Sequence, residues 1–326
     1  MTNVNIGGIS WVLNLVGEVI GQPVRMNRME AMNGSQQLLT SILGSYFMGV
    51  NSVIPSSFFV SVMRDFDLSE TATRNAVSRA SRQGLLVPSR HGRQTFYSLS
   101  ESAHERHQYR LKQIVDYGRE PVPWDGRWTV VTFSVEEPQR NLRHQLRQHL
   151  RQLGFGLLHD GVWVVPRTVE PDALAQLLDI GVPRLTVFSG PMRTAGTAAG
   201  DPMTAFAVEE MQEKLVGFSK RAADIVDALE DDSIIPTIAL RLRVEILRDW
   251  RVLGDEDPQL PTELLGADWP LPAARSLFER VYDDLASAAE ERLRHHLSSC
   301  APQLADSIGS LSTAEVAALE LVQSVP

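Results

Sequence analysis

Four polar side chains within nine residues have the types and the spacing of a surface that reads DNA. At 100° per residue they gather on one side of a helix: Arg74, Asn75, Ser78 and Arg82. Arginine and asparagine make paired hydrogen bonds to guanine and adenine edges in the major groove, and serine binds bases or phosphates. This pattern predicts a helix face that contacts DNA.

The helix that must carry these side chains is well marked at both ends. Ser69 is a good N-cap, Glu70 suits the first turn, and Gly84 is a natural residue just past the last turn. The opposite side is small and mostly apolar, with Ala72, Thr73, Ala76, Val77 and Ala80. Beyond its N-terminus the polar face has no acids, which an ordinary solvated helix would mix among its arginines.

A basic hairpin follows this helix. Leu85–Val87 and Gln94–Leu99 read as paired strands around a turn from Pro88 to Arg93. Helix, hairpin and basic tip predict a winged helix-turn-helix, with a solvated helix and surface hairpin as the plain alternative. The predicted DNA-binding residues are Thr73, Arg74, Asn75, Ser78, Arg79, Arg82, Arg90, His91 and Arg93. For Arg79, pairing with an acid such as Asp65 is an equal alternative.

Further helices are predicted on both sides of this helix and hairpin. Leucines and aromatics at helical spacing predict helices over Gln36–Phe47 and Ser57–Asp65 before it, and Ser100–Tyr117 is a polar connecting helix after it. Gly118–Gly126, with two prolines, is the clearest linker.

The middle of the chain alternates strands and helices. The order β-α-β-β-α-β predicts a ferredoxin-like module, built from Trp128–Phe133, Pro138–Leu153, Phe155–His159, Val162–Val165, Pro171–Asp179 and Arg184–Ser189. The polar face of its first helix is basic, with Arg143, His144, Arg147, His149 and Arg151. A solvated or dimer-facing surface is the preferred interpretation there, ahead of a second nucleic-acid site.

The rest is predicted to be helical. After a turn-prone stretch at Thr194–Pro202 come helices over Phe206–Ala228, Ile235–Trp250, Leu271–Ser299 and Thr313–Gln323, with a loop over Gly254–Pro272. The fold class is α+β multidomain. Its expected parts are a flexible extension (1–34), a winged helix (35–100), a connecting helix and linker (101–126), a ferredoxin-like domain (127–192), a helical effector or dimerisation domain (203–300) and a tail (301–326).

Composition limits the class of protein. With 326 residues, a net charge of −9 and a pI near 5.4, the chain is no general coat for nucleic acid, so DNA contact must be local. A single cysteine, Cys300, excludes an intrachain disulfide and a thiolate zinc cluster and fits a reducing cytoplasm. The apolar run Ile9–Gly17 is too short to span a membrane, so no membrane partner is expected.

The sequence contains no motif that is typical of an enzyme. No phosphate loop, nucleophile elbow or metalloprotease helix is present, so no catalytic residue, metal or cofactor is predicted. Glu291 and His295 stand four apart and could share a metal with His296. Because Arg292 and Arg294 adjoin them, an (i, i+4) surface pair is the preferred interpretation.

Several stretches resemble one family, the PaaX family of transcriptional repressors of phenylacetate catabolism. They are Leu38–Gly44, Arg74–Arg79 with Gly84, Gly92–Leu99, Trp128–Ser134 and Asp257–Pro270, and the resemblance covers about Gln36 to His296. It implies a dimeric, cytoplasmic bacterial repressor of a catabolic operon, induced by an aryl-acetyl coenzyme A thioester. The chain departs from the family where Gly266 stands in place of a frequent proline.

The middle segment also resembles a small CRISPR-associated endonuclease with a metal-binding aspartate at the end of its first strand. Ser134 follows Phe133 at that end here, and serine does not replace a carboxylate on a hard metal ion. The module is therefore interpreted as a structural or dimerisation relic.

An effector site is expected in the helical segment. Its candidates are Arg241, Arg243, Arg248, Trp250, Arg251, Trp269 and Tyr282, of which Arg241, Arg248, Trp250, Arg251 and Trp269 are the predicted set. Arginines pair with carboxylates or phosphates and tryptophans stack on rings, although both tryptophans are more typical of core anchors than of ligand contacts. The predicted function is a ligand-responsive repressor that binds operator DNA as a homodimer, with an aromatic acid or acyl-coenzyme A as inducer. The alternatives are a metal-dependent nuclease and a protein-interaction scaffold.

Overall fold

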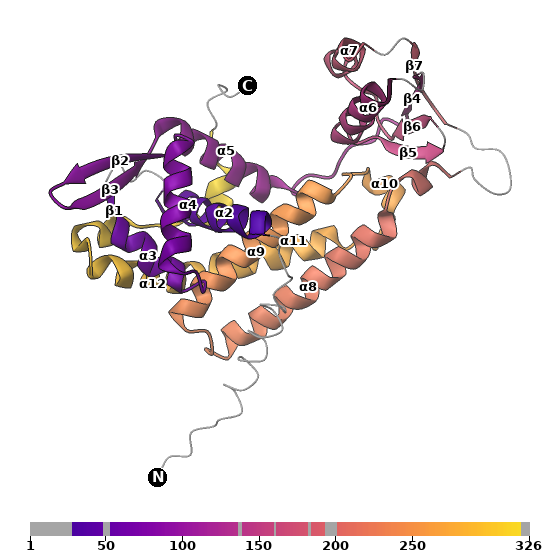
Figure 1. Ribbon diagram of the computed structural model, residues 1–326. Coiled ribbons are helices and arrows are strands. Elements are labelled where there is room, and N and C mark those ends of the chain that lie inside the picture. The colour runs from indigo at the N-terminus through magenta and orange to yellow at the C-terminus, as the bar shows by residue number, and fades with distance from the viewer. Residues whose placement is uncertain are drawn as a thin grey trace. The chain divides into compact units, whose positions relative to one another are not determined.

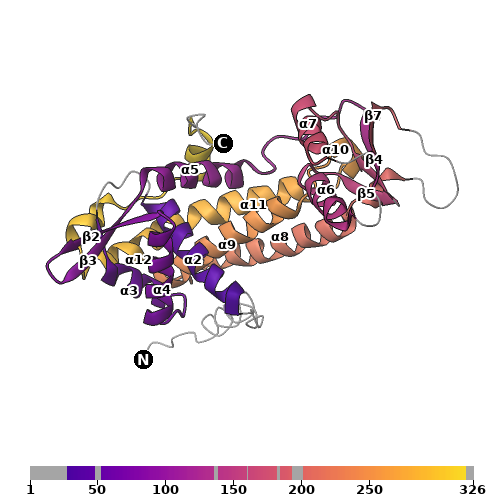
Figure 2. The same ribbon diagram turned by 45° about the horizontal axis from the view of Figure 1, so that its top comes forward.

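The computed structural model describes residues 28–47, 53–135, 139–159, 161–181, 184–192 and 201–320 (Figures 1 and 2). The fold is a mixture of helix and sheet with a helical C-terminal region. The chain divides into two compact units. The first comprises Met1–Arg119, Gly217–Gly254 and Ala273–Pro326, and the second comprises Glu120–Val216 and Asp255–Pro272.

The first unit begins with helices and a small sheet. Their order is α2 (Arg28–Tyr46), β1 (Ile54–Pro55), α3 (Ser56–Arg64), α4 (Glu70–Arg82), β2 (Leu86–His91), β3 (Gln94–Leu99) and α5 (Glu101–Asp116). The predicted helices are confirmed, but α2 starts at Arg28, inside the segment expected to be an extension. The remainder of that expected extension, 1–27, lies outside the described residues.

The sheet of this unit is antiparallel, with strand order β1-β3-β2 among the described residues. Strand β2 continues through Pro88 to His91, so the predicted six-residue turn was too long and the connection is Gly92-Arg93. Gly92 has φ +63°, the left-handed conformation that a two-residue hairpin loop favours for glycine. Strand β1 was not predicted, because two residues carry no periodic pattern.

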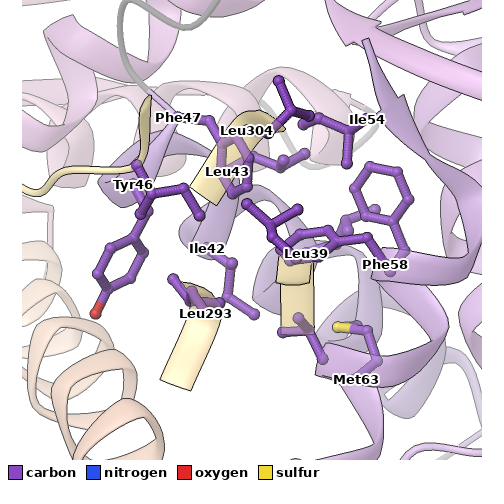
Figure 3. Packing of buried hydrophobic residues seen from close by; sticks show 14 of the residues in the cluster. Leu39, Ile42, Leu43, Tyr46, Phe47, Ile54, Phe58, Met63, Leu293 and Leu304 are labelled. Carbon is purple, nitrogen blue, oxygen red and sulfur yellow. The ribbon is translucent and has the colours of Figure 1, made fainter. Parts of the chain in front are cut away.

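The core of the first unit joins segments far apart in the sequence. Figure 3 shows Ile42 and Leu43 of α2 beside Leu293 and Leu304 from the C-terminal region. Edge-on aromatic pairs extend this core, since Phe58 lies 5.4 Å from Phe47 and 5.8 Å from Phe59 between ring centroids. The early helices and the C-terminal helices therefore bury one continuous apolar surface.

The C-terminal region consists of helices of both units. Its described elements are η2 (Pro202–Ala205), α8 (Val208–Glu230), α9 (Pro236–Glu256), α10 (Thr262–Leu265), α11 (Leu271–Asp284), α12 (Ala286–Ser298), η3 (Pro302–Ser307) and α13 (Thr313–Ala317). The single helix predicted over Leu271–Ser299 is wrong, because it is interrupted at Leu285. The loop predicted over Gly254–Pro272 contains the short helix α10.

The second unit is a sheet with helices on it. Its elements are β4 (Trp128–Ser134), α6 (Arg140–Gln152), β5 (Gly156–His159), β6 (Val162–Val165), α7 (Pro171–Asp179) and β7 (Arg184–Gly190), as the sequence predicted. The strand order is β5-β6-β4-β7, with antiparallel neighbours.

Two apolar layers hold this sheet. On one side α6 and α7 bury Leu146, Leu150 and Leu177 against Trp163 of β6. On the other, Phe206 and Leu260 cover Trp128 of β4. A Cβ on Gly156 would lie 2.5 Å from the carbonyl oxygen of Ala205, so only glycine allows β5 this close to η2.

Candidate nucleic-acid interface

Helix α4 is fixed at its start by its N-cap. The Ser69 hydroxyl accepts from the backbone N–H of Ala72 at 3.2 Å, as predicted. The structure corrects the assignment of Thr73 to the DNA-binding set. Thr73 is fully buried, and its hydroxyl donates to the carbonyl of Ser69 at 3.1 Å. A buried, bonded hydroxyl is not available to DNA, so Thr73 belongs to the inner face with Ala76 and Ala80.

The outer face of α4 is exposed and polar. Arg74, Asn75, Ser78 and Arg82 are all exposed, and Arg79 is half-buried. The Arg74 guanidinium contacts Glu70 one turn earlier, 2.5 Å from Nη2 to Oε1, and 72% of its side chain is exposed. An exposed pair at this spacing is worth about 0.3–0.5 kcal/mol. A good base contact is worth about 1–3 kcal/mol, so Glu70 does not prevent Arg74 from binding DNA.

The hairpin carries its charges at an open tip. Arg90, His91 and Arg93 are exposed, and none of the carboxylates in the described ranges forms an ion pair with Arg90 or Arg93. The His91 ring packs edge-on against Phe96, with ring centroids 5.3 Å apart. Arg90 and His91 lie on the paired strands, and Arg93 lies in the two-residue loop that joins them.

The base of the hairpin is tied to the end of α4. The Ser100 hydroxyl donates to the carbonyl of Gly84 at 2.6 Å, and the Ser100 N–H donates to that of Leu85 at 3.1 Å. Behind β3, the ring of Tyr97 lies 5.9 Å from that of Phe59 on α3. The base of the hairpin is thus fixed to the end of α4 by two hydrogen bonds and to α3 by a ring contact.

The turn between α3 and α4 is held by C-terminal helices. The Asp65 carboxylate accepts from Arg292 of α12 at 2.7 and 2.8 Å and lies 2.7 Å from Nε2 of His296. Asp67, with φ +59°, pairs with Arg241 of α9 at 3.0 Å. We call these four contacts, which Asp65 and Asp67 make with Arg241, Arg292 and His296, the turn clamp.

Electrostatics favour the ionised form of Asp65 in this clamp. Burial raises the pKa of Asp65, but the hydrogen bonds from Arg292 and His296 outweigh it and lower the pKa to about 2. Sequence reasoning considered Asp65 only as a partner for Arg79. The spacing of Arg292 and His296, four residues apart on one helix face, was the available signal for a shared acidic partner.

A second contact joins α2 to the C-terminal helices. The Arg243 guanidinium lies over the rings of Tyr46 and Tyr282, 5.0 and 3.8 Å from their centroids. Its Nε donates to the backbone carbonyl of Tyr282 at 2.8 Å. Burial raises the pKa of Tyr46 to about 12, so this hydroxyl stays neutral beside the cation.

The predicted effector residues of the first unit do not form a common site. The structure corrects the prediction of Trp250 as a ligand contact. Trp250 is fully buried and stacks on Phe278, with ring centroids 4.9 Å apart. Arg241 is engaged with Asp67, and Arg248 lies 3.1 Å from Asp249. Arg251 is half-buried in the first unit, whereas Trp269 belongs to the second.

The described residues offer neither a metal site nor a membrane-spanning helix. In the ranges that the structure covers, no group of three or more His, Cys, Asp or Glu side chains is arranged to hold a metal ion. His296, considered above as a metal ligand, contacts Asp65 instead. Among the described helices none has the length and apolar character to cross a membrane.

Comparisons with known proteins agree with this layout. Three domain models match in order: PaaX-like protein over residues 35–103, PaaX protein central Cas2-like domain over residues 121–200, and PaaX-like protein C-terminal domain over residues 206–295. Together they define a three-part protein with a Cas2-like centre. The chain belongs to the PaaX family.

One relative and one solved structure give the degree of similarity. The chain is 25% identical over 258 residues to the transcriptional repressor PaaX of Escherichia coli strain K12, over 77% of this chain and 80% of the relative. An uncharacterized protein from Mycobacterium tuberculosis aligns with a TM-score of 0.47 at 22% identity, covering 80% of this chain and 98% of that chain.

Proposed function

We propose that this chain is a transcriptional repressor that binds operator DNA with a winged helix-turn-helix formed by α2 to β3. The observation that carries the proposal is the exposed cationic face of α4 beside the basic tip of the β2–β3 hairpin. The name of the Escherichia coli relative, a transcriptional repressor, supports it.

Each part of this surface has a distinct proposed role. Arg74, Asn75 and Ser78 face outward from the first two turns of α4 and contact base edges in the major groove. Arg82 and the hairpin residues Arg90, His91 and Arg93 contact phosphates or the minor groove. Half-buried Arg79 lies at the border of this surface.

We further propose a homodimer, a ferredoxin-like central module without enzymatic activity, and a cytoplasmic location. The strand order β5-β6-β4-β7 with α6 and α7 on one face supports the module. In a dimer the two α4 helices would meet half-sites about one helical turn, roughly 34 Å, apart on a palindromic operator.

The inducer is proposed to be an aromatic acid or its coenzyme A thioester, which would relieve repression of a catabolic operon. A ligand alters repression only if it binds the DNA-competent and DNA-incompetent arrangements unequally. The turn clamp provides a route for this effect, because Arg241, Arg292 and His296 of the C-terminal helices contact the turn that precedes α4.

The test is binding of the purified protein to duplex DNA from upstream of its own gene at several salt concentrations. Arg74→Ala and Asn75→Ala are expected to lose about 1–3 kcal/mol of specific binding, roughly 5- to 150-fold. Arg93→Ala should weaken binding to all sequences and reduce the salt slope by about 1.

The matched control is Arg110→Ala, an exposed arginine on α5 that is not among the proposed DNA contacts. It should bind as the wild type does. If Arg74→Ala and Arg93→Ala also bind as the wild type does, the proposed surface is wrong. Release of the DNA by one compound from a panel of aromatic acids and their thioesters would identify the inducer class.

A further inference from the structure

The helix α6 of the second unit carries an unusual concentration of one charge. Among its 13 residues are four arginines and two histidines and no acid. Arg140, Arg143, Arg147 and Arg151 follow one another at intervals of three, four and four residues, so they form one stripe along the helix. We call these four residues the arginine stripe. The chain as a whole has a net charge of −9, so composition alone does not produce it.

The stripe opposes the stability of its own helix. Arg143, Arg147 and Arg151 are successive neighbours at i, i+4, where like charges repel. Arg140 begins the helix and no acid stands in the first turn, where the helix dipole favours a negative charge. By contrast, α8 begins with Glu209 and Glu210, and Lys214 pairs with Glu210 at 2.6 Å.

The structure shows no internal partner that relieves this repulsion for most of the stripe. Within the described ranges, Arg143, Arg147 and Arg151 form no ion pair with a carboxylate. Nη2 of Arg143 donates to the backbone carbonyl of Val135 at 2.7 Å, and this acceptor carries no charge of its own. An external anion would therefore stabilise both the arginines and the helix.

The arginines are also held in place. Leu146 and Leu150 on the inner side of α6 are fully buried against the sheet, which fixes the helix. The guanidinium of Arg151 lies 5.6 Å from the ring centroid of Trp163, and Arg143 is anchored at Val135. A guanidinium has five N–H donors, so these contacts leave donors for a phosphate.

We propose that the arginine stripe is a second DNA-binding surface, which contacts the phosphate backbone of a duplex beyond the base pairs read by α4. This inference rests on the proposed function, because operator DNA is the polyanion that function brings to the chain. From Arg140 to Arg151 the stripe is about 16 Å long. One strand of a duplex carries about five phosphates over such a length.

The experiment measures binding to nested duplexes from upstream of the gene, as a function of salt, by the full-length protein. The test variant is Arg147→Gln with Arg151→Gln, because glutamine preserves length and helix propensity while it removes charge. The slope of log K against log salt should fall by about 2 on long duplexes. On the shortest duplex that wild type still binds, variant and wild type should agree.

Two controls separate charge from folding. Arg147→Lys with Arg151→Lys keeps both charges and should retain the wild-type slope on long duplexes. Arg184→Gln removes an exposed charge from β7 of the same unit, outside the arginine stripe, and should also leave the slope unchanged. Each variant should have the thermal melting temperature of the wild type within a few degrees.

Three outcomes overturn the inference. The first is a wild-type slope for the Gln variant on every duplex while Arg93→Ala lowers it, which leaves the proposed function intact. The second is loss of dimer mass in the Gln variant, which would make the stripe an interface between two copies. The third is failure of the wild type to bind any duplex, which removes the proposed function as well.

Discussion

Breaking the turn clamp should lower the free energy of unfolding. In the clamp the side chain of Asp65 is 7% exposed and that of Arg292 is 24% exposed. Removing one partner of a buried ion pair costs about 3–5 kcal/mol, because the other charge is left without compensation. Arg292→Ala leaves the more buried charge with His296 as its remaining partner, so we expect a loss at the lower end of this range, about 3 kcal/mol in the free energy of unfolding.

Asp65→Ala should cost less, about 2 kcal/mol. Arg292 is the more exposed partner, so it can turn toward water once the carboxylate is gone. The pKa of Asp65 gives a similar figure, since its fall from 3.8 to about 2 corresponds to about 2 kcal/mol of favourable interaction in the ionised form. The double variant should then lose clearly less than the sum, with a coupling energy of about 2 kcal/mol.

The assay is urea unfolding of the wild type, both single variants and the double variant, followed by circular dichroism. Glu230→Ala is the matched control, because Glu230 pairs with Arg280 in the same unit but both side chains are exposed, at 62% and 48%. Such a surface pair contributes about 0–1 kcal/mol. Additive losses for Asp65 and Arg292, with coupling below about 0.5 kcal/mol, would refute the reasoning.

Three other predictions concern pH and the α4 surface. Because the pKa of Asp65 is depressed in the folded state, its contribution to stability should be lost as pH falls from about 4 to about 2, and acid titration of Asp65→Asn should lack this component. Glu70→Gln should raise DNA affinity a few-fold in the same binding assay, because it releases Arg74 and removes a charge that repels phosphates. Thr73→Val should leave DNA affinity unchanged, and a loss of specific binding would return Thr73 to the interface.

The sequence was sufficient where local rules decide the structure. Helix α4 was predicted from Ser69, Gly84 and the small residues between them, because caps and period act within a few residues. The element order of the second unit was read from strands bounded by turn residues. Thr73 borders both faces of α4 and was assigned to both, to the inner side by helical spacing and to the DNA-binding set. The structure supports the inner side.

Contacts between distant segments could not be predicted in this way. Asp65 and Arg292 are separated by 227 residues, and no pattern in either segment identifies the other. Trp250 was considered both as a ligand contact and as a core anchor, and only packing against Phe278 decided between them. The break at Leu285 likewise had no local signal, since neither glycine nor proline marks it.

These distant contacts bear on how binding of a ligand could affect the proposed DNA-binding surface. Leu293 and Leu297 of α12 share a core with Leu39 and Phe59 of the early helices, and α12 also supplies Arg292 to the turn before α4. A displacement of α12 would therefore change the apolar contacts and the ionic contacts of α3 and α4 at once. Packed cores have few alternative arrangements, so such a displacement favours two states over a gradual response. On this reasoning a displacement of the C-terminal helices would act on α4 directly, without a linker, because these helices form part of the structure that positions α4.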